Sequence, residues 1–137
     1  MSDNTAEGFT KGENVHTLLG VEIVEVTPDK VVMQVPMGPK VSQPYGILHG
    51  GVSALLAESA ASFGGALNVG PDQIVVGTEL NCSHLRSLSS GMLIATARPI
   101  RKGRRVQVWG IDLTDQDGRQ ICVARCTLQV LDGPAPD

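Results

Sequence analysis

The sequence predicts an α+β fold in which an antiparallel sheet wraps around one long central helix. Two β-rich runs precede residues 49–67, which are mostly small or good helix-forming residues, and four further β-rich runs follow them. The 137-residue chain is 42% hydrophobic, which suits one domain with a sizeable core. We expect this domain to span residues 13–131, between flexible ends at 1–12 and 132–137.

The first strands are expected at residues 21–26 and 31–37, after a short helix at 13–19. Pro28 holds the second position of the turn between these strands, where it suits a type I turn. The two strands are therefore predicted to form a hairpin that leads to the long helix.

The second group of strands begins after a Gly-Pro-Asp turn at residues 70–72. Strands are then expected at 92–100, 106–113 and 121–131, and Asp-Gly at 117–118 predicts a hairpin between the last two. Alternation predicts that the strand following the turn has one mostly apolar face, formed by Ile74, Val76, Thr78, Leu80 and Cys82.

The long helix carries a single carboxylate, Glu58, and has apolar residues on every face, so we expect other structure to enclose it. It is too rich in Gly, Ala and Ser for a membrane span, and the carboxylate lies near its middle. Its first N–H groups, at Gly50 and Gly51, lack helical partners and lie at the positive end of the helix dipole. The helix start therefore suits an oxygen with negative or developing negative charge.

Composition argues against several classes of partner. The formal net charge is −3 and only 3% of residues are aromatic, so neither nucleic acid nor a membrane surface is expected to bind. The first residues are polar and acidic, without the apolar core of a secretory signal, and we expect a cytoplasmic protein.

The three cysteines do not predict a metal site. Cys82 and His84 are two neighbouring ligands without an evident third, which is a weak signal, and we predict no metal. The other two are expected to be core thiols, because they share a strand face with apolar residues: Cys122, Ala124, Cys126, Leu128 and Val130.

The order of elements, together with Gln43, His49-Gly50-Gly51, Glu58 and Ser62, resembles the hotdog-fold acyl-CoA thioesterases from about residue 15 to 131. The likeness is to the branch with a helix glutamate that contains 4-hydroxybenzoyl-CoA and 1,4-dihydroxy-2-naphthoyl-CoA thioesterases. The related phenylacetyl-CoA thioesterases typically have Asp at the helix position, so Glu58 argues against that branch without excluding its substrates. The resemblance implies a hotdog fold, hydrolysis of an acyl-CoA with an aromatic or medium-sized acyl group, and no cofactor besides the CoA of the substrate.

The resemblance also implies residue roles that agree with thioester chemistry. The Gly50 N–H is expected to polarise the carbonyl, a contribution of roughly 3 to 4 kcal/mol for donors of this kind. Glu58 is expected to be the nucleophile or the general base, and both alternatives stay open. Gln43 is expected to orient the thioester or water, and His49 to shape the turn. Ser62, one helical turn beyond Glu58, is placed to hydrogen-bond the carboxylate or a water.

Arg101, Lys102, Gly103, Arg104 and Arg105 form a strongly basic turn in an acidic protein, and Arg86 follows another strand. Such a charge run is usually a solvated hairpin. The resemblance to thioesterases favours the alternative that these cations, with Gly103, contact the phosphates of CoA.

Gly50 and Glu58 are eight residues apart, or about 12 Å along a helix, so one chain is not expected to bring both to one thioester. We therefore expect homodimers with shared active sites, which the resemblance also implies, assembled as a dimer of dimers. Two alternatives remain. A non-catalytic acyl-CoA-binding hotdog protein would lack the helix carboxylate, and a hotdog hydratase or dehydratase would use a His-Asp pair.

Overall fold

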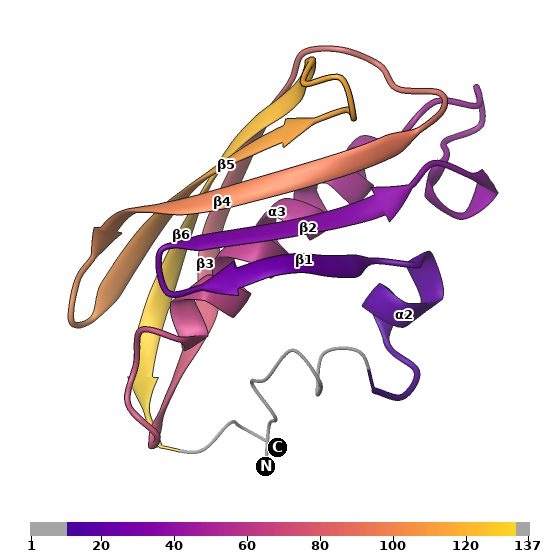
Figure 1. The fold of residues 1–137 in the computed structure, drawn as a ribbon. Coiled ribbons are helices and arrows are strands. Elements are labelled where there is room, and N and C mark those ends of the chain that lie inside the picture. Colours follow the sequence, from indigo (N-terminus) through magenta and orange to yellow (C-terminus); the bar gives the residue numbers. More distant parts are fainter. Residues whose placement is uncertain (1–10, 134–137) are drawn as a thin grey trace.

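A computed structural model describes residues 11–133 of the chain. Six antiparallel strands form one sheet that curves around the long helix α3 (Figure 1), so the predicted α+β architecture is confirmed. Residues 1–10 and 134–137, which belong to the two ends expected to be flexible, lie outside the described residues. The elements are α2 (Val15–Leu19), β1 (Glu22–Thr27), β2 (Lys30–Pro36), the 3₁₀ turn η1 (Pro39–Val41), α3 (Gly50–Ala66), β3 (Gln73–His84), β4 (Met92–Lys102), β5 (Val106–Thr114) and β6 (Gln120–Asp132).

The strand order is β1-β2-β4-β5-β6-β3, so the two strands next to α3 in sequence lie far apart in the sheet. The predicted hairpins β1–β2 and β5–β6 are both formed. β3 forms one edge of the sheet, and its partner is β6. The chain between β2 and β3 thus carries α3 across the concave side of the sheet (Figure 1).

Glycines and a buried glutamine set how closely α3 approaches the sheet. A Cβ at Gly64 would lie 2.5 Å from the Trp109 ring, and one at Gly65 would lie 2.4 Å from the Leu128 side chain. Gln107 donates to the Gly65 carbonyl at 3.2 Å and accepts from the Trp109 indole N–H at 2.9 Å. Only glycine fits at these positions without displacing packed side chains.

Within the described residues, the expected enclosure of α3 comes from the sheet on one side of the helix. The buried residues of α3, among them Leu56, Ala57, Ala60 and Ala61, face the sheet. On the opposite side Glu58 is exposed and Leu55 is half-buried. Within residues 11–133 the curved sheet covers one side of α3 and α2 contacts it at Ser59, while Leu55 and Ser62 on the remaining faces stay half-buried. None of the helices in residues 11–133 is long and apolar enough to cross a membrane.

The predicted apolar face of β3 is correct only for its second half. Leu80 and Cys82 pack against the core as expected, but before them Val75 does so. Gly77 pairs with Leu128 and Glu79 with the adjacent Thr127, so β3 contains one extra residue at a β-bulge. An extra residue reverses which side chains face inward, and simple alternation cannot reveal it. The expected core face of β6 is confirmed.

The short helix α2 docks on α3. Asn14 caps its start by accepting from the His16 and Thr17 amides, and Gly20 ends it with a φ of 80°. The His16 imidazole Nε2 lies 2.7 Å from the Ser59 hydroxyl of α3. Burial lowers the pKa of His16, because a charged imidazole would lose hydration at this contact.

Candidate active site

The start of α3 leaves one backbone donor available. The Gly51 N–H donates to the Nδ1 atom of His49 at 2.8 Å, and the Val52 N–H donates to the His49 carbonyl at 2.9 Å. Among the described residues no hydrogen bond uses the Gly50 N–H. His49 thus shapes the helix start as its N-cap, while the Gly50 amide is free to meet a ligand oxygen.

A pocket of about 430 Å³ lies beside this amide. Gly50 and Ser53 from α3 line it together with His84 from the end of β3 and Arg86 from the segment that follows. The His84 ring is so close that a Cβ at Gly50 would lie 3.0 Å from its Cε1 and Nε2 atoms. From the sequence, His84 is a weak candidate for a metal ligand and part of the stretch His84-Leu85-Arg86, which also resembles the thioesterase branch, but it has no predicted role at the Gly50 pocket. His84 reaches the pocket because β3 ends next to the start of α3, and no local sequence pattern indicates that these two ends meet.

Ser53 has an unusual environment in this pocket. Its side chain is only 1% exposed, yet its hydroxyl has no hydrogen-bond partner among the described residues. A buried hydroxyl without a partner has lost its hydration without compensation.

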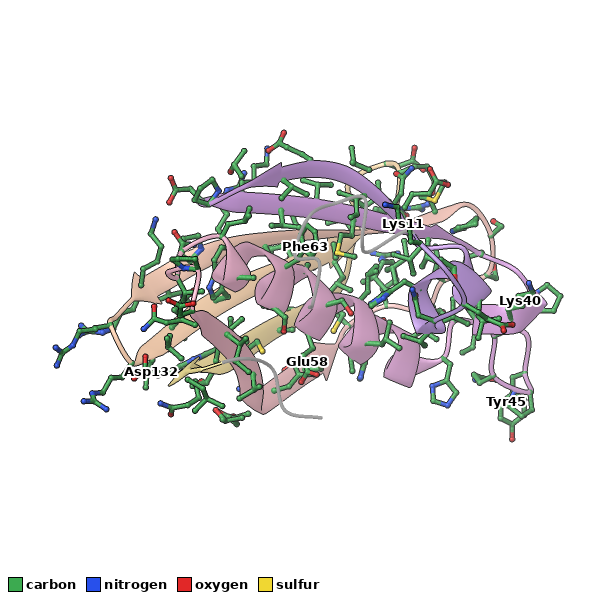
Figure 2. The ribbon with its side chains drawn as sticks, turned by 90° about the horizontal axis from the view of Figure 1, so that it is seen from below. Lys11, Lys40, Tyr45, Glu58, Phe63 and Asp132 are labelled. Carbon is green, nitrogen blue, oxygen red and sulfur yellow. The ribbon has the colours of Figure 1, made fainter. Side chains whose placement is uncertain are left out.

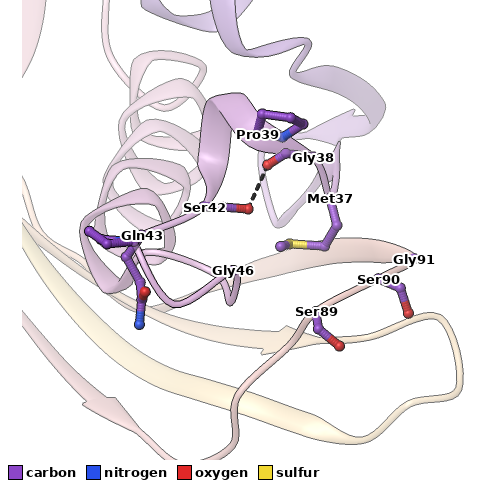
Figure 3. A pocket seen from close by; sticks show the side chains of 10 residues that line it. Met37, Gly38, Pro39, Ser42, Gln43, Gly46, Ser89, Ser90 and Gly91 are labelled. Atoms are coloured by element: carbon purple, nitrogen blue, oxygen red, sulfur yellow. Dashed lines mark hydrogen bonds between the residues drawn. The ribbon is translucent and has the colours of Figure 1, made fainter.

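Gln43 lies in a neighbouring hairpin rather than in the Gly50 pocket. The side-chain oxygen of Gln43 accepts from the Tyr45 backbone N–H, and the backbone N–H of Gln43 donates to the Ile47 carbonyl at 2.9 Å. It lines a second pocket, of about 760 Å³, next to Ser42, whose hydroxyl donates to the Gly38 carbonyl at 2.7 Å (Figure 3). Within one chain Gln43 is therefore held by its own turn.

Glu58 and Ser62 lie on the open side of α3, away from Gly50. Figure 2 shows Glu58 projecting from α3 on the side opposite to β1 and β2. Its carboxylate rests against the backbone of Gly77 in β3. No hydrogen bond joins Ser62 to Glu58 among the described residues, and eight residues, about 12 Å of helix, separate Glu58 from Gly50. One chain thus presents the expected catalytic groups at two separate places.

The basic turn lies at the opposite end of α3. Lys102 forms an ion pair with Asp29 of the β1–β2 turn and also contacts Asn68, just beyond the end of α3. One of the four cations of the turn is therefore neutralised by a carboxylate from another turn. Arg104 and Arg105 are exposed and line a small pocket of about 230 Å³ near Asp132.

Gly103 closes this turn by donating to the Val106 carbonyl at 2.9 Å. A Cβ at Gly103 would lie 2.5 Å from that same oxygen, so a side chain is excluded there. Because α3 has 17 residues, the turn lies about 25 Å along the axis from the Gly50 of its own chain. Arg86, by contrast, lies at the Gly50 pocket.

The cysteines are not candidates for nucleophiles. All three are free thiols, and burial raises the pKa of Cys122 to about 11 and that of Cys126 to about 12. A thiol with such a pKa carries almost no thiolate near neutral pH. In residues 11–133 no three His, Cys, Asp or Glu side chains are grouped so as to hold a metal ion.

Residues 45–122, which include the free amide and the exposed carboxylate, match the model of the family described as the thioesterase superfamily. The chain belongs to this superfamily. It is 48% identical over 112 residues to a 1,4-dihydroxy-2-naphthoyl-CoA hydrolase of Listeria monocytogenes, covering 82% of this chain and 91% of the relative. It is 38% identical over 113 residues to the proofreading thioesterase EntH of Cronobacter turicensis, covering 82% of each chain.

A solved structure supports the same assignment. The thioesterase HI1161 of Haemophilus influenzae superimposes with a TM-score of 0.88 at 38% identity, covering 93% of this chain and 91% of the other. The resemblance to hotdog thioesterases and the expected fold are thereby confirmed. As a member of the thioesterase superfamily, the chain is an enzyme that hydrolyses thioesters.

Proposed function

We propose that this thioesterase hydrolyses an aromatic acyl-CoA to the free acid and CoA, without a metal or a further cofactor. The observation that carries the proposal is the unused Gly50 N–H at the start of α3. Gly50 lines a pocket together with His84 and Arg86. The aromatic acyl class is supported by the 48% identity to a 1,4-dihydroxy-2-naphthoyl-CoA hydrolase.

The first part of the site stabilises charge on the substrate. The Gly50 amide, at the positive end of α3, donates to the thioester carbonyl oxygen, which becomes more negative as an oxygen nucleophile attacks the carbon. Gln43 and His49 belong to the same end of the helix and complete this half of the site. Gln43 orients the thioester or water once its side chain leaves the Tyr45 amide.

The second part of the site comes from another subunit. In an antiparallel pair of α3 helices, Gly50 of one chain faces Glu58 of the partner subunit, which removes the separation of about 12 Å. Such a pair also covers Leu55 and Glu58 on the open side of α3. Glu58 then either attacks the carbonyl carbon, so that the C–S bond breaks, CoA leaves and water hydrolyses the resulting anhydride, or it takes a proton from the water that attacks this carbon and displaces CoA. Ser62 of the same helix supports the carboxylate or that water.

This arrangement also brings a basic turn toward the substrate. From Glu58 to Asn68, which touches Lys102, is ten residues, or about 15 Å. The partner's turn therefore lies about 15 Å beyond Gly50 along the axis, compared with about 25 Å for the turn of the same chain. We assign Arg86 and the partner subunit's Arg104 and Arg105 to the phosphates of CoA. We propose a cytoplasmic dimer of dimers, as the resemblance implies.

The test is a screen of acyl-CoA esters with a reagent that detects released thiol. Aromatic acyl-CoA esters are expected to give higher kcat/KM than straight-chain esters, and Glu58→Gln is expected to lower kcat by several orders of magnitude without unfolding the protein. Thiol release that Glu58→Gln leaves unchanged would contradict the role of Glu58. A chain that binds CoA esters without releasing thiol would be the non-catalytic binding protein, and loss of activity with EDTA would contradict the metal-free reaction.

A further inference from the structure

Glu58 is in contact with a residue that has no side chain. A Cβ built on Gly77 would lie 3.0 Å from the Glu58 Oε1 atom, 3.1 Å from its Cδ and 3.5 Å from its Cγ. The carboxylate therefore lies directly on the backbone of β3. Gly77 does not have a positive φ, so its backbone conformation does not require glycine. The group that an added Cβ would press against, and displace by a few tenths of an ångström, is the carboxylate of Glu58.

The backbone at this point is held in place by the β-bulge. Gly77 pairs with Leu128 and Glu79 with Thr127, while the extra residue, Thr78, donates from its hydroxyl to the Thr127 carbonyl at 3.2 Å. Bulges commonly redirect a strand next to a functional site. Here the bulge fixes the edge strand where Glu58 rests on it.

Gly77 differs from the glycines that let α3 pack on the sheet. At Gly64 and Gly65 an added Cβ would meet the Trp109 ring and the Leu128 side chain inside the core. At Gly77 the neighbour is the far end of a flexible and exposed side chain. An alanine at position 77 can therefore be accommodated by moving the Glu58 carboxylate, without repacking the core.

We propose that Gly77 is a positioning residue for Glu58: the missing side chain in β3 sets where the carboxylate of α3 rests. This inference rests on the catalytic role of Glu58 under the proposed function. A nucleophile or base must lie about 3 Å from its reacting partner, and a displacement of about 1 Å can lower the rate up to about 100-fold. The bulge of β3 and the middle of α3 thus act together in the reaction.

The test compares Gly77→Ala with Gly110→Ala, a strand glycine at which an added Cβ meets only the flexible end of Ile100, at 3.4 Å. Gly77→Ala is expected to lower kcat by about 3- to 10-fold, since the carboxylate shifts by a few tenths of an ångström, with KM and the thermal midpoint close to those of the wild type. Gly110→Ala is expected to leave all three unchanged. In the Glu58→Gln background, Gly77→Ala is expected to change the residual kcat less than twofold, because the group that it displaces is already disabled.

The outcomes separate the two proposals. If Gly77→Ala kept wild-type kcat while Glu58→Gln lost it, only the positioning role would be refuted. If kcat fell only together with the thermal midpoint, Gly77 would be a folding residue and the inference would be wrong. An equal loss in the wild-type and Glu58→Gln backgrounds would also refute it, because Gly77 would then act elsewhere. Wild-type turnover in Glu58→Gln would overturn the proposed role of Glu58 itself.

Discussion

The buried hydroxyl of Ser53 is a feature that the pattern of apolar and polar residues does not reveal. The Ser53 hydroxyl is buried in the Gly50 pocket without a partner, which lowers the stability of the folded state. Natural proteins often retain a destabilising group at a functional site, because the residue that is best for activity is not always the one that is best for stability. A substitution at Ser53 is therefore expected to increase stability.

Replacing Ser53 with Ala is expected to stabilise the fold by about 1 kcal/mol, because the substitution removes an unsatisfied hydroxyl and alanine favours helix. Denaturant unfolding measures this change. Ser62→Ala, at a half-buried serine of the same helix, is the matched control and is expected to change stability by less than about 0.5 kcal/mol. A destabilised Ser53→Ala would mean that the hydroxyl has a partner in the assembled enzyme.

The exposed arginines of the basic turn are expected to act on the nucleotide part of the substrate. Changing Arg104 and Arg105 together to Ala should raise KM for CoA esters more than it lowers kcat, because contacts to phosphate hold the substrate and the transition state equally. A pantetheine thioester without the nucleotide phosphates should be much less affected. Lys30→Ala, which removes a cation paired with Glu25, is the control. Equal effects on both substrates would assign the turn to folding or solubility.

At the residue scale, the sequence indicates candidate site residues but not the groups that surround them in the fold. The sequence motif groups Gly50, Glu58 and Ser62. It does not reveal that Glu58 is exposed or that His84 of β3 contacts Gly50 of α3, because both facts depend on how separate elements pack. The ion pair between Lys102 and Asp29 spans 73 residues and was missed for the same reason. Long-range contacts of this kind depend on the order of strands in the sheet, which alternation does not encode.

At the scale of elements, α2 contacts α3 through the His16 imidazole, whose pKa is lowered by burial. Burial lowers the pKa of His16, so the folded state holds this imidazole neutral at a pH where the unfolded chain already binds a proton. Its stability contribution is complete above the unfolded pKa of 6.5 and is lost as pH falls through it toward the folded pKa. The contact with Ser59 is therefore expected to weaken in acid.

A His16→Gln variant tests this dependence. Between about pH 7.5 and pH 5.5 the wild type should lose more thermal stability than the variant, because the variant lacks the titrating group. Parallel losses in the wild type and His16→Gln would show that the contact does not respond to protonation.

Element boundaries were predicted closely, since α3 and the six strands end within a few residues of the expected positions. The exception is instructive. The bulge at Gly77 reverses the inward face of β3, so Val75 rather than its neighbours packs on the core. A glycine inside a strand is the available signal for such a bulge. The reason for that glycine, the carboxylate of Glu58, comes from another element.

At the scale of the whole molecule, the shared site can be tested by mixing inactive subunits. Gln43→Ala and Glu58→Gln are each expected to be inactive, and refolding them together should produce mixed dimers. One site in each mixed dimer collects both lesions and the other collects none, so activity should return to about a quarter of the wild-type level if the subunits mix at random. Mixed dimers that are proven by mass spectrometry and remain inactive would contradict the shared site.

The spacing of Gly50 and Glu58 along one rigid helix also has a consequence for how the enzyme responds to its own abundance. With the two groups about 12 Å apart, an isolated chain holds two incomplete halves and no complete centre. Subunit association is then part of catalysis, and mass action governs the fraction of working centres. At very low protein concentration, turnover per chain should therefore rise with the amount of protein, so that a cell making twice as many chains would gain more than twice the rate.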